Sequence, residues 1–483
     1  MANPIKKLFG EIAIYGVSSI VGRLLNYLLV PLYTYVFVNP ADYGVVSELY
    51  AWVAFLIVIL TFGMETAFFK FLQNEKDKAS VFSTSFSALF ALNSLFFFLI
   101  LVFNENIAGF MLYENHGEYI IMLGAIVGID AICALPLAQL RAEEKAKKFS
   151  IIQLSSIAVN IVLNLVFLLV YFNPKNPDEG VFYIFVANLL ASSVKLLFLS
   201  KSFSKIAAID WNLLKRMIFY SFPLAIAGFA GIINETLDRI LLKQILFNPG
   251  NPSSLEQAEA QVGIYSASYK LAMLVTILLQ AYRYAAEPFF FNQMKNENRN
   301  KIYSQIMNVF IAVVCVVFLL VTLNIDVFKY FIQNEAYWVG LKVVPILLMA
   351  NIFLGIYFNQ SIWYKLSGKT QFGAYIALTG AFLTVVINVL CIPKYGYMAC
   401  AWATLIVYFV QMVLSYMLGQ KYYPIPYNLK KVVLYIGLSL LLYALSPYLR
   451  MDNYTWNFII QNCLLVIFVV MVYVLEWKRR PIL

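Results

Sequence analysis

Long apolar stretches recur along the whole chain, and they limit its possible folds more than any other feature of the sequence. A helix needs about 20 apolar residues to cross the hydrocarbon of a bilayer. Fourteen stretches are predicted as membrane spans: 10–37, 43–69, 81–104, 118–140, 150–172, 181–200, 214–238, 262–289, 302–324, 339–365, 371–392, 396–419, 429–448 and 456–477. The segment 326–338 is predicted to lie at the membrane interface before the tenth span. The sequence therefore predicts an all-α integral membrane protein with about 14 transmembrane helices.

Composition supports lipid as the solvent of this chain. Hydrophobic residues make up 62% of it and charged residues only 12%, whereas a soluble domain carries about 25% charged residues. The net charge of +10 could indicate a nucleic-acid partner. The sequence contains no nucleic-acid recognition motif, and membrane proteins gather Lys and Arg in cytoplasmic loops. We therefore expect membrane lipids, and no nucleic acid, around this protein.

Lysine and arginine are concentrated in alternate loops. If the N-terminus is cytoplasmic, the predicted inner segments hold twenty-four of the 35 Lys and Arg residues and the outer segments hold seven. The other four lie within spans. One missed or additional span would disturb this alternation. The pattern therefore predicts an even number of spans with both termini in the cytoplasm.

The two halves of the chain resemble each other at several matched offsets. The aligned positions are Gly44 with Gly263, Ser47 with Ser266, Tyr50 with Tyr269 and Asn164 with Asn388. Chance similarity among apolar helices is the alternative, but the shared offsets favour a six-helix unit used twice. Two such units have the same orientation, so they are expected to pack as parallel lobes with the cargo site between them. The predicted domains are an N-terminal lobe at 1–205, a C-terminal lobe at 206–420 and two accessory spans at 421–483.

Catalytic and metal chemistry find little support in the sequence. The only histidine, His116, lies in a polar loop, and the five cysteines form no CxxC pair. A histidine-based zinc site or a Ser–His triad within the bilayer is therefore not expected. The predicted loops are short and contain no inserted soluble domain. We expect a transporter without a catalytic or metal site, not an enzyme.

A polar stripe is predicted on the first span. Ser19, Arg23 and Asn26 share one helical face because they are four and three residues apart, and Tyr15 and Tyr27 share the same side. A charge at bilayer depth is costly and usually marks a cavity or a pathway. The stripe is therefore predicted to face a wet cavity, where the tyrosines could stack on sugar rings.

An ion pair is the alternative interpretation of Arg23. Asp130 lies in the middle of the fourth predicted span and could be its structural partner. Lys195, near the inner end of the sixth span, is instead expected to extend its ammonium to the interface.

A second group of charges lies towards the predicted outer half of the C-terminal lobe. Glu235 and Arg239 are four residues apart on the seventh span and are expected to pair. Asp238 is adjacent, and Lys270 lies about two turns into the eighth span. Asp238 and Lys270 form either a second pair or a separate proton site and anion site, and the sequence leaves both open.

The chain resembles the polysaccharide-transporter branch of the MOP flippase superfamily, the Wzx-type lipid-linked oligosaccharide flippases. The segments that carry the resemblance include GVSSIVGRLLNYLLVPLYTYVFVNPADYGVVSELYAW, TFGMETAFFKF, LRAEEKAKKFS, VGIYSASYKLA and SIWYKLSGKT. It covers nearly the whole chain and rests on the ensemble of segments. The resemblance implies a two-lobed transporter of twelve plus two helices in the bacterial inner membrane. It also implies other polysaccharide-assembly membrane proteins as interaction partners.

The same resemblance implies a cargo and a set of roles. The cargo is a polyprenyl-pyrophosphate-linked oligosaccharide repeat unit for O-antigen, capsule or exopolysaccharide. Arg23 resembles the family's first-helix cavity cation, with Arg239 and Lys270 as partners in the other lobe, and arginine suits bidentate contact with phosphate. No cofactor is expected apart from a coupling Na⁺ or H⁺. The candidates for binding that ion are Asp130, Asp238 and Glu235.

Three other functions fit the sequence less well. A multidrug cation antiporter of the same superfamily needs an acidic cavity, and Arg23 would repel cationic drugs. A membrane glycosyltransferase or polysaccharide polymerase generally needs a sizeable outer loop, which this sequence lacks. A sugar transporter of the major facilitator type would carry a GxxxDRxGRR-like loop after the second span, where this chain has KFLQNEKDKAS.

The predicted cavity role of Arg23 can be tested by Arg23→Ala. We expect this variant to insert into the membrane but to lose transport, because a neutral side chain cannot compensate an anionic headgroup. Surface polysaccharide is measured in a deletion strain that carries the variant, with membrane fractions blotted for the protein. Normal export by Arg23→Ala would remove this residue from the mechanism.

Overall fold

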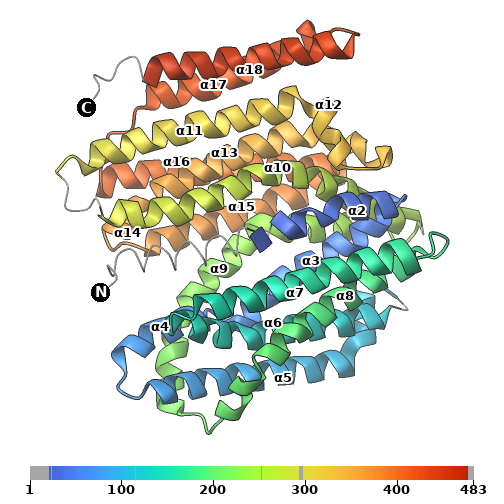
Figure 1. Cartoon of the computed structure of the whole chain (residues 1–483), viewed down its shortest axis with the longest axis vertical. Coiled ribbons are helices and arrows are strands. Elements are labelled where there is room, and N and C mark those ends of the chain that lie inside the picture. Colours follow the sequence, from blue (N-terminus) through green and yellow to red (C-terminus); the bar gives the residue numbers. More distant parts are fainter. Residues whose placement is uncertain (1–20, 23, 115, 252, 293–296, 477–483) are drawn as a thin grey trace. The chain divides into compact units, whose positions relative to one another are not determined.

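The computed structural model describes residues 21–22, 24–114, 116–251, 253–292 and 297–476. These ranges are helical and contain no strand (Figure 1). In chain order the helices are α2 (Leu29–Val36), α3 (Pro40–Thr61), α4 (Met64–Asn74), α5 (Lys78–Phe110), α6 (Gly117–Ala142), α7 (Ala146–Val166), α8 (Pro177–Phe198), α9 (Trp211–Leu246), α10 (Ser253–Asn292), α11 (Arg299–Leu323), α12 (Ile325–Phe328), α13 (Val344–Gln360), α14 (Ile362–Leu366), α15 (Gln371–Tyr395), α16 (Tyr397–Tyr422), α17 (Leu429–Leu445) and α18 (Tyr454–Glu476).

Thirteen helical stretches of the described chain are long and apolar enough to cross a membrane. They correspond to predicted spans two to fourteen, and the described part of the first span is the shorter apolar helix Leu24–Val36. The predicted interfacial segment 326–338 contains α12 and short 3₁₀ turns ahead of α13. The all-α membrane fold predicted from the sequence is therefore confirmed.

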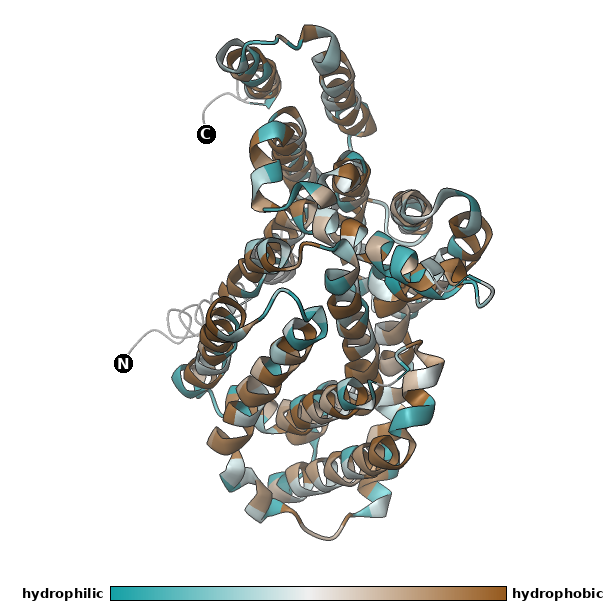
Figure 2. Cartoon of the chain, turned by 90° about the vertical axis from the view of Figure 1, so that its right-hand side faces the viewer, coloured by the Kyte–Doolittle hydropathy of each residue, from teal (hydrophilic) through white to brown (hydrophobic). Residues whose placement is uncertain are grey.

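Hydrophobic residues recur along the helices (Figure 2), and many large apolar side chains are exposed while others are buried. In α7 and α18 only a small part of the apolar stretch is buried, whereas in α6 and α11 most of it is buried. Exposed apolar surface on this scale has no place in water, so lipid must cover it. The chain is a multi-pass membrane protein.

Helix boundaries follow local hydrogen bonding. Asn39, Asp77 and Asp210 cap the first turns of α3, α5 and α9, since each side chain accepts from main-chain N–H groups that have no partner within the helix. The break between α3 and α4 falls at Phe62 and Gly63, whose φ angles are 49° and 64°. A left-handed residue cannot continue a right-handed helix, so the chain turns there.

Packing divides the chain into two units, 1–263 and 264–483. In unit 1, α5 packs against α6, α7 against α8, and α3 against α9. In unit 2, α16 packs against α13 and α15, while α11 packs against α17 and α18. The boundary lies inside α10. It follows contacts and not the internal repeat, so the domains at 1–205, 206–420 and 421–483 stay a prediction.

The loops of unit 1 gather at two ends, as the charge pattern predicts. At one end Arg141 pairs with Glu65, and Arg216 Nη1 lies 2.7 Å from Glu75 Oε1. All of these residues flank loops predicted as inner, and we call this the basic end. At the other, sparse end, Asn39 donates to Glu256 across 2.7 Å. The loops that were predicted to share a side therefore meet in space.

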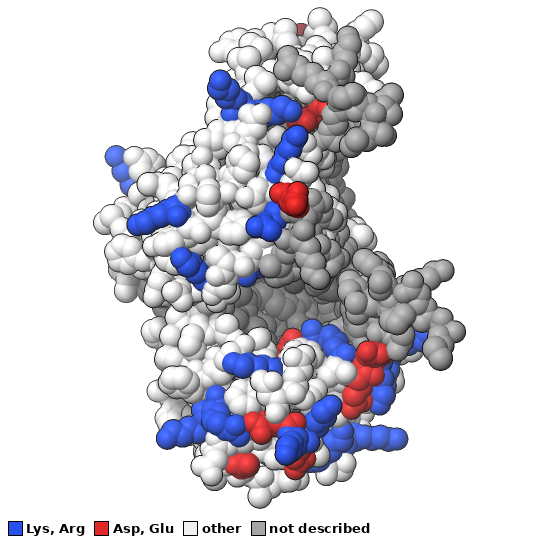
Figure 3. All heavy atoms as spheres, turned by 90° about the vertical axis from the view of Figure 1, so that its left-hand side faces the viewer, with Lys and Arg blue, Asp and Glu red and all other residues white. Residues whose placement is uncertain are grey.

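Unit 2 shows the same grouping. Lys431 at the start of α17 pairs with Glu476 at the end of α18, with 2.7 Å between Nζ and Oε1. Asp326 and Arg450 lie 3.6 Å apart between two loops predicted as outer. Lys and Arg side chains are numerous on the face of the protein seen in Figure 3. These contacts join loops that were predicted to share a side, while the orientation of the chain in the membrane stays a prediction.

Two glycines bring α3 and α10 into backbone contact at the sparse end of unit 1. A Cβ on Gly44 would lie 1.9 Å from the main-chain oxygen of Glu259, and a Cβ on Gly263 would lie 1.9 Å from that of Pro40. Each partner lies four residues before the opposite glycine, so the contact is reciprocal. Gly44 and Gly263 are also the positions that the internal alignment pairs. Close helix approach of this kind requires small residues.

We expect Gly44→Ala to destabilise the protein, because the added methyl group cannot fit against the main chain of α10. Forced overpacking of this kind costs about 1–3 kcal/mol. The midpoint of thermal unfolding is measured by size-exclusion chromatography of heated samples in detergent. Gly128→Ala in α6 is the matched control, since no atom lies within 4 Å of its Cβ position. Equal midpoints for the two variants would contradict the close crossing.

Candidate functional site

The predicted stripe on the first span is described only in part. Tyr15, Ser19 and Arg23 lie outside the described residues. Asn26 is exposed, and Tyr27 is buried with 7% of its surface accessible. The predicted shared face of these side chains therefore stays a prediction.

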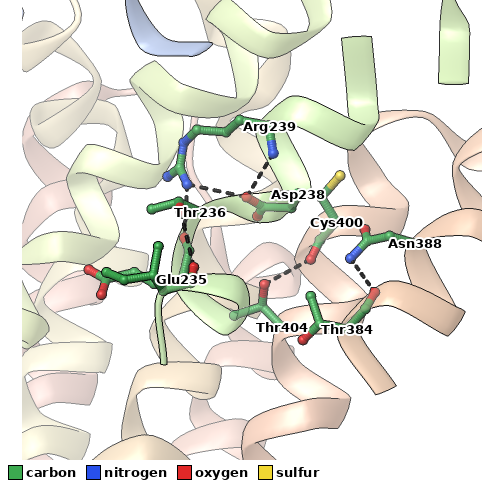
Figure 4. A network of polar contacts seen from close by, with 9 residues as sticks. Glu235, Thr236, Asp238, Arg239, Thr384, Asn388, Cys400 and Thr404 are labelled. Atoms are coloured by element: carbon green, nitrogen blue, oxygen red, sulfur yellow. Dashed lines mark hydrogen bonds and ion pairs between the residues drawn. The ribbon is translucent and has the colours of Figure 1, made fainter. Parts of the chain in front are cut away.

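Asp238 and Arg239 form a buried ion pair on α9 (Figure 4). Arg239 Nη1 donates to Asp238 Oδ1 across 3.2 Å and to the main-chain oxygen of Glu235 across 2.9 Å. The side chain of Glu235 is exposed. The sequence predicted a Glu235–Arg239 pair, whereas the ion pair in the structure is with the adjacent Asp238. The reason is helix geometry, because the guanidinium folds back along its own turn and meets a carbonyl and not the Glu235 carboxylate.

Lys270 is half-buried on the part of α10 that belongs to unit 2. Arg239 belongs to unit 1. Arg283, further along α10, is exposed, and its guanidinium lies 4.3 Å from the centre of the Phe358 ring. A cation that rests on an aromatic face is stabilised by the negative face of the ring.

Asp130 has a cation partner on a neighbouring helix. Its Oδ1 lies 2.5 Å from Nζ of Lys195, so α6 and α8 are joined by an ion pair at depth in the bundle. Both side chains are mostly buried. The sequence considered Arg23 as the partner of Asp130 and expected Lys195 to reach the interface. In the structure Lys195 is the partner of Asp130, because the two residues lie on adjoining helices at the same level.

Asn164 and Asn388, which the internal alignment pairs, share one hydrogen bond, although only Asn164 Oδ1 also accepts from a tyrosine, Tyr33. Both are fully buried. Asn164 Nδ2 donates to the main-chain oxygen of Asn160, one helical turn earlier. Asn388 Nδ2 donates in the same way to the main-chain oxygen of Thr384 (Figure 4). The likeness of the two halves therefore extends from the sequence to side-chain geometry.

A buried cluster of three charged residues in unit 1 was not anticipated from the sequence. Nζ of Lys243 lies 3.0 Å from Oε2 of Glu48 and 3.1 Å from Oε1 of Glu259. The side chains of Glu48 and Lys243 are fully inaccessible, and that of Glu259 is 13% exposed. The three residues come from α3, α9 and α10, so one ammonium joins three helices. We call them the Glu–Lys–Glu cluster.

Uncharged groups complete the surroundings of this cluster. Tyr113 donates its hydroxyl to Oε2 of Glu48, and Trp52 donates Nε1–H to Oε1 of Glu48 across 3.1 Å. Lys243 donates to the main-chain oxygen of Met111 across 3.1 Å, and its Nζ lies 3.3 Å from the centre of the Tyr113 ring. Buried charges are tolerated only when their remaining hydrogen-bonding capacity is met in this way.

The sequence carried one signal for this cluster. Glu48 lies within the predicted span 43–69, and an acid at bilayer depth marks a functional candidate. Lys243 was assigned to an outer loop because the seventh span was predicted to end at 238. In the structure α9 continues to Leu246 and buries Lys243. Glu259 gave no signal, since its burial depends on the crossing of α3 and α10.

Among the described residues, no group of three His, Cys, Asp or Glu side chains is arranged to hold a metal ion.

Comparison with known proteins gives a family match. A family model described as "Polysaccharide biosynthesis protein" matches residues 8–294, more than half of the chain. No curated protein matches the sequence.

Solved structures share the fold over most of the chain. The lipid II flippase MurJ in an inward closed conformation superposes with a TM-score of 0.69 at 13% identity, covering 96% of this chain and 98% of that one. An inward-facing MATE multidrug resistance transporter of the MOP superfamily gives 0.61 at 15% identity, covering 85% and 94%. The Vibrio cholerae MATE transporter VcmN gives 0.53 at 12% identity, covering 86% and 96%.

Removing the cation of the Glu–Lys–Glu cluster is expected to destabilise the protein strongly. Lys243→Met leaves two buried carboxylates without an opposite charge, and breaking a buried pair costs about 3–5 kcal/mol. Combining it with Glu48→Gln and Glu259→Gln should restore much of the loss, because the cluster becomes neutral. Thermal unfolding in detergent is the measurement.

The matched control is Lys175→Met, which removes an exposed ammonium in a loop of the same unit. Its unfolding midpoint should equal that of the unmodified protein. A Lys243→Met variant as stable as this control would mean that the cluster does not hold the three helices together.

Proposed function

Because the chain belongs to the polysaccharide biosynthesis protein family, we propose that it moves polyprenyl-pyrophosphate-linked oligosaccharides across the bacterial inner membrane. It is a flippase of the MOP superfamily, a membrane transporter and not an enzyme. The proposal concerns the cargo, the membrane and the coupling ion. The oligosaccharide would serve the synthesis of O-antigen, capsule or exopolysaccharide.

The extent of the fold comparison carries the choice of a lipid-linked cargo. The lipid II flippase covers 96% of this chain, whereas the two multidrug transporters cover 85% and 86%. The similarity to the lipid II flippase thus extends over more of this chain than the similarity to the multidrug transporters. Together with the family match, this favours a lipid-linked glycan over a cationic drug as the cargo. Cationic drugs remain the alternative cargo.

The chemistry of the headgroup supports the same choice. A pyrophosphate is anionic, and its passage through a low-dielectric region requires cations. Arg23, Arg239 and Lys270 are our candidates for this role, since a guanidinium can bind phosphate through two parallel hydrogen bonds. Arg239 is buried beside Asp238, so binding of phosphate would exchange one anionic partner for another.

Orientation follows from the grouping of loops. The basic ends of both units are assigned to the cytoplasm, because Lys and Arg are retained on that side during insertion. Both termini would then be cytoplasmic. The headgroup would enter from the basic end and leave from the sparse end as the protein changes conformation.

A coupling ion would have to bind where the charge is not already balanced. Asp130 and Asp238 each have an ion-pair partner, and Glu235 is exposed. These three carboxylates stay candidates for an Na⁺ or H⁺ site. For Asp130 or Asp238 to bind the ion, it would first have to leave Lys195 or Arg239.

The proposed cargo is tested by deleting the gene and identifying the lipid-linked glycan that accumulates on the cytoplasmic leaflet. We expect one species to accumulate and surface polysaccharide to be lost, with both restored by the wild-type gene. Purified protein in liposomes should then move that glycan, and the rate should depend on an imposed Na⁺ or H⁺ gradient if either ion is coupled.

The control is a dye-efflux assay with cationic drugs in the same strains. Unchanged surface polysaccharide, with no accumulated glycan, would contradict the flippase proposal. Drug sensitivity of the deletion strain in that case would favour the multidrug alternative.

A further inference from the structure

The Glu–Lys–Glu cluster contains more acid than base. Two carboxylates, Glu48 and Glu259, share the single ammonium of Lys243. With all three ionised, the cluster carries one uncompensated negative charge in a largely water-free position. Two carboxylates that share one site favour the uptake of a proton by one of them.

The two carboxylates differ in how well they are held. Both oxygens of Glu48 accept hydrogen bonds, from Trp52 and from Tyr113, and its Oε2 also contacts Lys243. Glu259 is contacted by Lys243 through Oε1 and is partly accessible. Hydrogen bonds donated to a carboxylate favour its charged form. Glu259 is therefore the carboxylate that can accept a proton from the water at the sparse end.

The other titratable groups around the cluster are mostly acidic. Glu256 on α10, Asp42 on α3 and Asp178 at the start of α8 lie within electrostatic reach of Glu259 or of each other. Tyr113 and Tyr119 face the cluster from the segments before and within α6. On α9, one turn before Lys243, Arg239 is paired with Asp238. These neighbours add negative potential, which favours a proton further.

The cluster lies beside the crossing of α3 and α10. Glu48 follows Gly44 by four residues on α3, and Glu259 precedes Gly263 by four residues on α10. Lys243 on α9 contacts both carboxylates, so the two ion pairs in series hold α10 against α3. Loss of the Lys243–Glu259 pair leaves the crossing without its ionic link, while Glu48 and Lys243 still neutralise each other.

We propose that Glu259 is a proton-binding site and that its protonation releases α10 from α3 at the sparse end of unit 1. The proton adds to a carboxylate oxygen of Glu259 and no other bond is made or broken. As a step of transport, this inference rests on the proposed function, since it identifies a proton as the coupling ion. The proton site and the helix release can be measured without any cargo.

The direction of the pH effect follows from linkage. The packed form holds Glu259 ionised beside Lys243, and the released form holds it protonated. Falling pH therefore increases the released fraction. A single proton changes the ratio of the two forms by at most about tenfold per pH unit.

The release is measured by the distance between spin labels on Val38→Cys and Gln257→Cys. Both positions are exposed and lie on either side of the crossing. The labels are placed in a background with Cys391→Ser and Cys463→Ser, because the other three cysteines are buried. Full-length protein in lipid nanodiscs is studied by pulsed electron paramagnetic resonance between pH 4.5 and 8.5. We expect a second, longer distance that grows as the pH falls.

Three variants test which carboxylate binds the proton. Glu259→Gln should give the longer distance at every pH, since it imitates the protonated acid. Glu48→Gln leaves one acid and one base, so the transition should persist but shift to lower pH by about one unit or more. Glu256→Gln is the matched control, because the glutamine amide oxygen can still accept the hydrogen bond from Asn39. The pH-dependent increase in the spin-label distance should therefore still be observed in this variant.

Infrared spectroscopy provides a second readout that does not depend on labels. A carboxylic-acid C=O band should appear in the same pH range in the wild-type protein and be missing in Glu259→Gln. Each variant is first checked for a monodisperse size-exclusion profile. If Glu259→Gln does not fold, Glu259→Asp is used instead, and this variant should keep a carboxylic-acid C=O band that appears as the pH falls.

Two results would overturn the proposal: a distance distribution that does not change with pH, or a transition that survives in Glu259→Gln. These results are separate from the test of cargo. Glycan movement without a titrating Glu259 would leave the flippase proposal intact and remove the proton site. A titrating Glu259 without glycan movement would do the reverse.

Discussion

Pairing of charge within a low-dielectric bundle is the constraint on which the rest of this structure depends. Asp130 with Lys195, Asp238 with Arg239, and Glu48 and Glu259 with Lys243 all bring opposite charges together between or along helices. An ion taken from water into the bundle costs several kcal/mol unless a partner and hydrogen bonds meet it. These pairs therefore fix which helices can be neighbours and at what level.

The same constraint separates structural charges from functional ones. Pairs of one acid and one base are neutral and can be purely structural. The Glu–Lys–Glu cluster is different, because its charge is unbalanced and one of its carboxylates is partly accessible. A cluster with unbalanced charge is sensitive to pH, since the uptake of a proton neutralises it. Its position beside a helix crossing converts that response into movement.

The crossing of α3 and α10 brings together two glycines that the internal alignment pairs. Gly44 and Gly263 align in the sequence and contact each other's helix through main-chain oxygens four residues earlier. A reciprocal contact of this kind is expected where two like-oriented repeats meet, and the repeat itself stays a prediction from the sequence. Asn164 and Asn388 repeat the pattern with equivalent hydrogen bonds. Small residues and buried amides, not the apolar majority, carry the likeness of the two halves.

The sequence by itself determined the fold class, the number and place of most spans, and the grouping of loops at two ends, because these depend on local hydrophobicity and loop charge. It could also indicate Asp130, Asp238 and Arg239 as charges at depth. It could not give their partners. Lys195 is paired with Asp130, and Lys243 lies in the end of α9 and not in the predicted loop. Only the tertiary structure decided that Glu48, Lys243 and Glu259 meet, because their contact depends on how closely three helices approach, and a glycine at one crossing sets that distance.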